Sequence, residues 1–214
     1  MGADMATDQQ HTIEKYRRHA ATYDCRAARG KAIRRKAIAR LRLRPADVVL
    51  DVACGTGINF SLIEQAIGKD GHLIGIEVSS DMLGKARERI DTHGWQNVTL
   101  IQSPAEHAKI PCKADAVLFS FTHDVLQSPR ALENVFRHVK AKGRVAATGT
   151  KWAPWWAIPL NLYIWYMARQ YVTTFEGFRA PWAKLARFVP DLQIEAYGFG
   201  SAYVAWGATS SGAA

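Results

Sequence analysis

The chain has 214 residues, of which 48% are hydrophobic and 22% are charged, as is usual for a single soluble globular domain. Its three cysteines are widely spaced, which argues against a disulfide framework or a zinc site and favours a reducing compartment. The polar first residues predict no secretory signal, and the longest apolar run, residues 152–168, contains prolines and is short for a bilayer span. We therefore expect a cytoplasmic protein without a metal site.

The formal net charge of +9 is concentrated before residue 45. Residues 15–44 contain twelve Lys or Arg and a single acid, Asp24. Three interpretations stay open: a solvated helix face, a contact with an anionic membrane that would make the protein membrane-peripheral, or a nucleic-acid surface.

In chain order, the hydrophobic pattern predicts helices that alternate with short β-rich runs. The expected helices cover residues 31–43, residues 58–67, a segment after the N-cap Ser79, and a segment that Ser128-Pro129 opens and the "KAKG" turn ends. The expected strands are "VVLDV", "HLIGIEV", "NVTLI", "AVLFSF" and "RVAATGT". Such alternation predicts a parallel sheet that is covered on both faces.

Two further β-rich runs, "LQIEAYGF" and "SAYVAWGAT", follow near the C-terminus. Only a short loop around Gly200 and Ser201 separates them, which is too short for a crossover helix. They are therefore predicted to add an antiparallel hairpin to the sheet.

The turn after the first strand, "DVACGTG", indicates a ligand site. Gly55 and Gly57 permit close approach to the backbone, and the following helix points free N–H groups at that place. Glu77 ends the second strand twenty-two residues after Gly55, where an acid binds a ribose diol. The combination predicts an adenosine-containing ligand. Asn59 and Phe60 replace the third glycine of a dinucleotide site, and a Walker loop is absent.

The series "VVLDVACGTG", "GIEVSSDML", "NVTLIQSPAEH", "ADAVLFSF" and "HVKAKGRV" resembles the class I S-adenosylmethionine-dependent methyltransferases over roughly residues 45–150. "YRRHAATYD" is similar to the cofactor-capping segment of ubiquinone/menaquinone-type and bacterial phosphatidylethanolamine-type methyltransferases. The resemblance implies an α/β, Rossmann-like fold with a seven-stranded, mostly parallel sheet, an antiparallel C-terminal hairpin and helices on both faces. It also implies one domain in four parts: a basic helical cap (1–44), a cofactor-binding core (45–150), an apolar acceptor-site lid (151–190) and a hairpin that completes the sheet (191–214).

Carried over by position, the resemblance implies a set of residues that bind S-adenosylmethionine. These are Tyr16, Asp51, Ala53, Gly55, Gly57, Glu77, Ser79, Met82, Ala105, Glu106, Phe119 and Ser120. Two positions depart from the family pattern. Ala53 stands where glycine is frequent, and Pro104 stands where an acid often contacts the adenine amino group.

Three residues are candidates for catalysis: His123 and Asp124, just after the fourth strand, and Tyr23 in the basic segment. A histidine with a pKa near 6.5 suits a general base at neutral pH. Alternatively, His123 hydrogen-bonds a loop, Asp124 caps a helix, and Tyr23 only packs.

The segment after the fifth strand is dense in aromatic residues, which favours a lid over an apolar acceptor pocket. The acceptor-binding candidates are Trp152, Trp155, Trp156, Tyr163 and Met167. The alternative is an ordinary buried helix.

We therefore expect methyl transfer to an oxygen or nitrogen of a hydrophobic small-molecule acceptor. The alternative is N-methylation of a phosphatidylethanolamine-like phospholipid at a membrane surface. Nucleic acid is disfavoured because the fourth strand ends "FSFTHD" rather than in an Asn/Asp-Pro-Pro-aromatic motif. A non-catalytic cofactor binder is a further hypothesis, and the sequence leaves the oligomeric state open.

Overall fold

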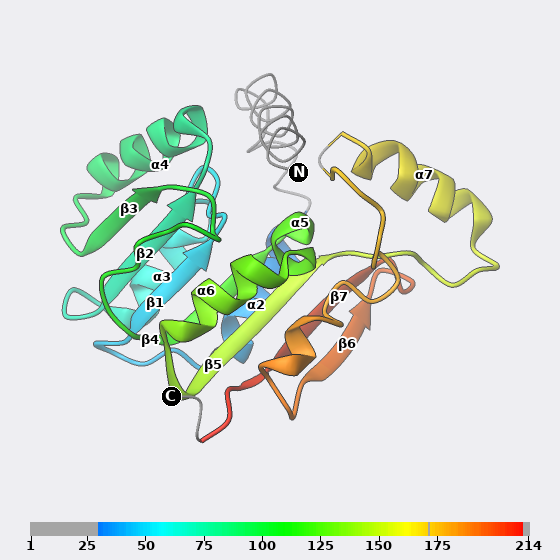
Figure 1. Cartoon of the computed structure of the whole chain (residues 1–214). Coiled ribbons are helices and arrows are strands. Elements are labelled where there is room, and N and C mark those ends of the chain that lie inside the picture. The colour runs from blue at the N-terminus through cyan, green and yellow to red at the C-terminus, as the bar shows by residue number, and fades with distance from the viewer. Residues whose placement is uncertain (1–29, 171, 212–214) are drawn as a thin grey trace.

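The computed structural model describes residues 30–170 and 172–211, which form a single seven-stranded sheet with helices on both faces (Figure 1). The strands are β1 (Val48–Val52), β2 (His72–Glu77), β3 (Val98–Gln102), β4 (Ala114–Ser120), β5 (Val139–Thr150), β6 (Gln193–Tyr197) and β7 (Ala202–Ala208). The helices are α2 (Lys31–Arg40), α3 (Phe60–Ile67), α4 (Ser80–His93), α5 (His123–Gln127), α6 (Pro129–Arg137), α7 (Ile158–Ala168) and the 3-10 helix η2 (Leu185–Arg187).

The strand order is β3-β2-β1-β4-β5-β7-β6, so the connections change direction at β1. Strands β1 to β5 run parallel, and β1 pairs with both β2 and β4. The carboxyl ends of these strands therefore meet at one edge of the sheet, and a crevice for a ligand forms where the order reverses. This topology brings together the segments that follow β1, β2 and β4.

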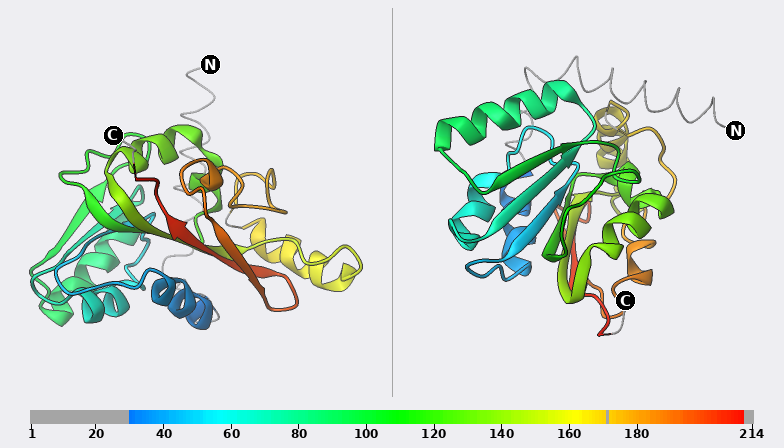
Figure 2. Two further views of the ribbon diagram at one scale, coloured as in Figure 1. Left: turned by 90° about the horizontal axis from the view of Figure 1, so that it is seen from below. Right: turned by 60° about the vertical axis from the view of Figure 1, so that its left-hand side comes forward.

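The side chains of β1 alternate between two packed layers, because successive residues of a strand point to opposite faces. Val49 packs in the layer that contains α2, α3 and α4, whereas Leu50 and Val52 pack in the layer that contains α6. Figure 2 shows α2 and α3 on one side of the sheet and α6 on the other. The prediction of helices on both faces is confirmed.

Two of the predicted helix starts are confirmed by their caps. The Ser79 hydroxyl accepts the Met82 N–H at the start of α4, and the Ser128 hydroxyl accepts the Ala131 N–H at the start of α6. Each bond satisfies an amide that has no partner within its own helix.

The predicted C-terminal hairpin is also confirmed, since β7 pairs antiparallel with both β5 and β6. The predicted "KAKG" turn is wrong. These residues lie inside β5, whose pairing with β4 shifts register between Ala114 and Ala116. A strand that contains such an irregularity bends without ending, and Lys142 takes a positive φ of 57° there.

The described part of the basic segment packs against the C-terminal hairpin. The Arg40 guanidinium lies 2.9 Å from the Glu195 carboxylate and 4.0 Å from the centroid of the Trp206 ring. Lys36 Nζ lies 4.8 Å from the Tyr197 ring centroid. These cations thus take part in contacts within the fold, and residues 1–29 of the predicted cap lie outside the described part of the chain.

Across the described ranges, no helix combines the length and apolarity that crossing a bilayer requires. Within the same ranges, no group of His, Cys, Asp and Glu side chains is arranged to hold a metal ion.

Candidate cofactor and acceptor site

The turn between β1 and α3 has an unusual backbone. Ala53, Gly55 and Gly57 all lie in the left-handed region, with φ values of 53°, 58° and 70°. A Cβ at Gly57 would approach the Phe60 ring to 2.7 Å, so a glycine is required there. Ala53 adopts this conformation despite its Cβ, which costs about 1–2 kcal/mol. The turn thus keeps a strained backbone at the crevice, as functional sites often do.

Glu77 ties this turn to the start of α4. One carboxylate oxygen accepts the Gly55 N–H at 3.0 Å, and the other accepts the N–H groups of Val78 and Ser79, both at 2.9 Å. Burial raises the pKa of Glu77, and these three hydrogen bonds oppose the rise. The carboxylate is thereby fixed in orientation at the end of β2, within reach of a ligand in the crevice.

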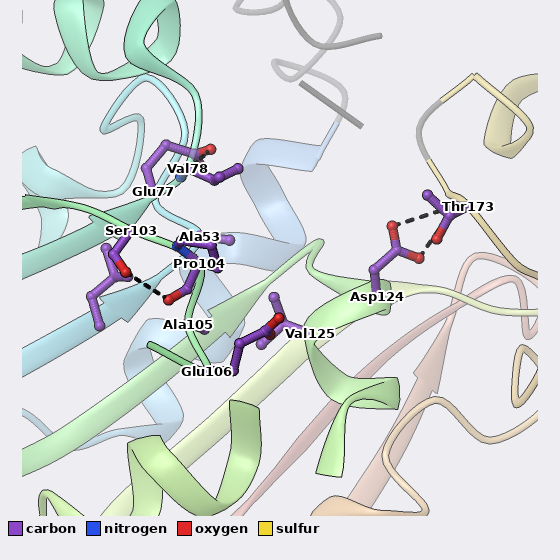
Figure 3. Close-up of a pocket in the computed structure, with 11 residues that line it drawn as sticks. Ala53, Glu77, Val78, Ser103, Pro104, Ala105, Glu106, Asp124, Val125 and Thr173 are labelled. Atoms are coloured by element: carbon purple, nitrogen blue, oxygen red, sulfur yellow. Dashed lines mark hydrogen bonds between the residues drawn. The ribbon is translucent and has the colours of Figure 1, made fainter. Parts of the chain in front are cut away.

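A cavity opens at this edge of the sheet, between the ends of β2 and β4 (Figure 3). Its lining consists of Ala53, Ile76, Glu77, Val78, Ser103, Pro104, Ala105, Glu106, Asp124, Val125 and Thr173. The structure therefore brings together four predicted cofactor residues, Ala53, Glu77, Ala105 and Glu106, with the catalytic candidate Asp124. In Figure 3, Asp124 and Thr173 lie across from Glu77 and Ser103.

Asp51 is fully buried in β1, next to the turn. The Asn59 side-chain amide donates to its carboxylate at 3.1 Å and 3.4 Å. Burial raises the pKa of Asp51 from 3.8 to about 7, while the Asn59 hydrogen bond and the charge of Arg34 oppose the rise. A carboxyl group that titrates near neutrality at the end of a central strand is typical of a functional site.

Arg34 and Phe121 lie near Asp51 and the end of β4, outside the cavity lining, and neither was among the residues predicted from the sequence. Arg34 is only 5% exposed, and its guanidinium lies 4.4 Å from the centroid of the Phe121 ring. Phe121 follows β4 with a positive φ of 59°, which is rare for a bulky residue. A single arginine inside a basic segment carries no signal of burial, whereas the position of Phe121 directly after a buried strand was an available signal.

Four other residues that were predicted to bind the cofactor do not line the cavity. Ser79 caps α4, and Met82 is buried with 1% exposure. Phe119 is buried in β4, with its ring stacked on that of Phe136 at 6.3 Å. Ser120, at the end of β4, is 8% exposed, and its buried hydroxyl has no hydrogen-bond partner among the described residues.

His123 begins α5 and is 9% exposed. Its Nε2 lies 3.0 Å from the Glu176 carbonyl oxygen, and its ring meets the Phe178 ring edge-on at 5.0 Å. Burial lowers the pKa of His123, which the Asp124 charge and the carbonyls of Glu176 and Thr174 oppose. Because Nε2 must carry the proton to donate to a carbonyl, Nδ1 keeps a lone pair, and within the described residues it has no hydrogen-bond partner.

Asp124 holds the segment that follows α7. Both carboxylate oxygens accept the Thr173 N–H, each at 3.3 Å. The contact fixes one wall of the cavity to the start of α5, as the dashed lines in Figure 3 show.

The acceptor-binding candidates do not line the cavity. Trp152 stacks on Phe175 at 5.4 Å, and Met167 is half-buried on α7. Trp155, Trp156 and Tyr163 are 80%, 64% and 52% exposed. The candidates Tyr16 and Tyr23 lie outside the described residues.

The residues of the crevice fit the cofactor that the resemblance implies. Glu77 offers a fixed carboxylate for ribose hydroxyls, and the half-buried backbone of Gly55 beside it is where an aminocarboxylate would lie. Asp51 offers a buried negative charge when ionised, which suits a ligand that carries a sulfonium and an ammonium group.

Comparisons with known proteins add independent findings. Residues 49–143 match the family described as methyltransferase domain. A demethylmenaquinone methyltransferase of Symbiobacterium thermophilum is 30% identical over 145 residues, which make up 64% of this chain and 57% of that protein. An arsenite methyltransferase of Halobacterium salinarum is 28% identical over 106 residues, which make up 49% of this chain and 27% of that protein.

Among solved structures, the N-methyltransferase NodS from Bradyrhizobium japonicum in complex with S-adenosyl-L-homocysteine matches with a TM-score of 0.69. The match covers 92% of this chain and 98% of that chain at 14% sequence identity, so it concerns the fold. The chain spans less than two thirds of the length of both curated relatives.

Proposed function

We propose that this chain, which carries a class I S-adenosylmethionine-dependent methyltransferase domain, moves a methyl group from S-adenosylmethionine to an oxygen or nitrogen of a hydrophobic small-molecule acceptor. One curated relative is named for demethylmenaquinone, which supports a small hydrophobic acceptor. The activity and the acceptor of the whole protein are both part of the proposal.

One observation carries the assignment of the acceptor. Three buried polar atoms at the end of β4 have no hydrogen-bond partner among the described residues: Ser120 Oγ, Thr122 Oγ1 and His123 Nδ1. Leaving such atoms unpaired costs about 1–3 kcal/mol each. The three residues do not line the cavity themselves but directly precede Asp124 and Val125, which do, so a polar group that reached these atoms from the cavity would gain affinity. The Phe178 ring, which is 2% exposed, borders His123 and makes the surroundings of this residue apolar.

In this reaction, S-adenosylmethionine supplies an activated methyl group on a sulfonium whose leaving group is a neutral thioether. The task of the chain is then to align the acceptor atom with that methyl group, which contributes about 7–11 kcal/mol in well-oriented systems. Glu77 and the glycine turn would hold S-adenosylmethionine. Ser120 and Thr122 would orient the acceptor. His123 Nδ1 would take the proton of a phenol, acid or ammonium group as the new bond forms.

A transfer assay tests the proposal. The protein is incubated with methyl-labelled S-adenosylmethionine and a panel of phenols, amines, demethylmenaquinone, arsenite and phosphatidylethanolamine vesicles, and the products are identified by mass spectrometry. We expect a methylated oxygen or nitrogen on a hydrophobic small molecule. Methylation of arsenite or of a ring carbon alone would contradict the assignment of the acceptor.

Isothermal titration of S-adenosylmethionine tests the cofactor site separately. Gly55→Arg should abolish binding, because an arginine side chain would fill the turn. Gly84→Arg is the matched control, since no atom lies within 4 Å of a Cβ at that position. Equal binding by wild type and Gly55→Arg would contradict the site.

A second candidate, N-methylation of a phosphatidylethanolamine-like lipid at a membrane surface, draws support from the exposure of Trp155 and Trp156. In the same assay, it predicts methylated phosphatidylethanolamine in the vesicle fraction and no product from soluble phenols.

A further inference from the structure

The turn before α7 and the outer side of α7 expose an unusual amount of apolar surface. We call this surface the aromatic face; it consists of Trp155 (80% exposed), Trp156 (64%), Ile158 (61%), Leu162 (63%), Trp165 (46%) and Tyr166 (51%). Large contiguous apolar patches on soluble proteins mark surfaces that contact something else.

The opposite side of α7 attaches the helix to the protein. Ile164 is 4% exposed and forms a small cluster with Ala153 and Phe178, against which Leu160 and Ala168 pack. The inner stripe of the helix follows a four-residue spacing and consists of residues 160, 164 and 168. The stripe on the outer side consists of residues 158, 162, 165 and 169. The helix is therefore apolar on two opposite sides, and only one of them is used inside the fold.

The Trp155–Trp156 turn is fixed beside the start of α7. The Asn161 side chain accepts the Ala153 N–H at 2.9 Å and donates to the Pro154 carbonyl at 3.2 Å. The Ala157 N–H donates to the same carbonyl at 2.9 Å. The aromatic face is thus a shaped surface rather than a set of separate exposed side chains.

The chain that carries this face is cationic. Residues 145–175 contain Lys151 and Arg169 but no Asp or Glu. Arg169 is exposed, and its guanidinium lies 4.9 Å and 4.8 Å from the ring centroids of Trp165 and Tyr166. Trp and Tyr with a neighbouring cation form the composition that favours the headgroup level of an anionic bilayer.

We infer that the aromatic face docks on the surface of an anionic lipid bilayer, with α7 parallel to the membrane plane. With eleven residues α7 is too short to span a bilayer, but it is long enough to immerse one side. A symmetric dimer through the same face would bring Arg169 and its copy together, and the face itself contains no acid to pair with them.

The segment that follows α7 connects the aromatic face to the cavity wall. The chain leaves α7 and reaches Thr173, whose N–H donates to Asp124 on the cavity wall. Phe175 and Phe178 on the same segment pack with Trp152. The docking itself does not depend on the proposed function.

Vesicle co-sedimentation tests this inference. The whole chain, without cofactor or acceptor, is mixed with phosphatidylcholine vesicles or with mixed phosphatidylcholine/phosphatidylglycerol vesicles. We expect binding to the mixed vesicles that weakens with added salt and is much poorer with phosphatidylcholine alone.

Three variants locate the contact. Trp155→Ser combined with Trp156→Ser should weaken partitioning by about tenfold or more, because each Trp loses apolar burial in the interface. Arg169→Glu should also weaken it by about tenfold and reduce the salt dependence. Ile194→Ser is the matched control, since Ile194 is 43% exposed on β6 and is not part of the aromatic face.

Several outcomes would overturn the inference. These are absence of wild-type binding, equal loss in the Ile194→Ser control, and vesicle binding that the Trp and Arg169 variants leave unchanged. A concentration-dependent dimer in sedimentation velocity that the Trp variant dissociates would instead assign the face to a second copy. Because the assay contains no acceptor, a failure of the proposed transfer reaction would leave this result standing.

Discussion

Replacing Asp51 by Asn should make the protein more stable at neutral and alkaline pH. Asp51 is fully buried, and burial raises its pKa from 3.8 to about 7. In the unfolded chain this carboxyl loses its proton near pH 4, whereas the folded protein retains the proton until about pH 7. Between these two values the folded state binds more protons, so stability falls as the pH rises.

The pKa difference sets the magnitude of the effect. Above pH 7, the ionised Asp51 destabilises the fold by about 4 kcal/mol, and from pH 5 to pH 8 stability falls by about 3 kcal/mol through this group alone. Asparagine has nearly the same shape and offers an oxygen that still accepts the Asn59 amide. It removes the charge and with it the dependence on pH.

Urea unfolding of wild type and Asp51→Asn at pH 5 and pH 8 measures this effect. The variant should gain about 3 kcal/mol more over wild type at pH 8 than at pH 5, and it should bind S-adenosylmethionine less tightly. Asp115→Asn is the control. Burial tends to raise the pKa of Asp115, but the hydrogen bonds from Lys140 and Val48 and the charges of Lys140 and Arg144 together lower it, so this variant should lose stability by about the same amount at pH 5 and pH 8. A stability difference between wild type and Asp51→Asn that stays constant with pH would refute the reasoning.

Three further changes have defined expectations. Glu77→Gln should weaken binding of S-adenosyl-L-homocysteine by about 10–150-fold in calorimetry, because charge-assisted hydrogen bonds contribute about 1.5–3 kcal/mol. The control Glu133→Gln, at an exposed position, should leave this binding unchanged. Ala53→Gly should raise the free energy of unfolding by about 0.5–1 kcal/mol, because it relieves the left-handed strain at a partly offsetting entropic cost; a loss of stability in urea melts would contradict this. His123→Ala should lower kcat by about 10²–10⁴-fold with little change in cofactor affinity. The activity of the wild type should rise with pH through a pKa below 6.5, because burial lowers the pKa of His123. Unchanged turnover of the variant on the true acceptor would reject the role of His123 as base.

The sequence predicted the architecture well because its signals are local. β-branched runs such as Val48–Val52, capping residues such as Ser79 and Ser128, and the glycines after β1 each act within a few residues. The parallel arrangement then follows from the alternation of strands and helices. The "KAKG" segment was wrongly predicted as a turn because Lys and Gly at a bulge inside a strand look the same as Lys and Gly in a turn.

The surroundings of the site depend on contacts between distant segments. Arg34 approaches Phe121, Asp124 binds the Thr173 amide, and His123 contacts the Glu176 carbonyl only because α2, β4 and the segment after α7 converge at one edge of the sheet. The spacing of residues in the sequence contains no information on these contacts. The same holds for pKa values, since burial acts through all neighbours at once.

The aromatic segment, residues 152–168, shows most clearly what the sequence determines and what the tertiary structure decides. The sequence by itself determined that residues 152–168 are apolar and rich in Trp and Tyr, because composition is a property of the chain alone. Tertiary structure alone decided that Ile164 faces inward while Trp155, Leu162 and Trp165 face outward. A helix that is apolar on all sides has no preferred inner face until a neighbouring surface covers one of them.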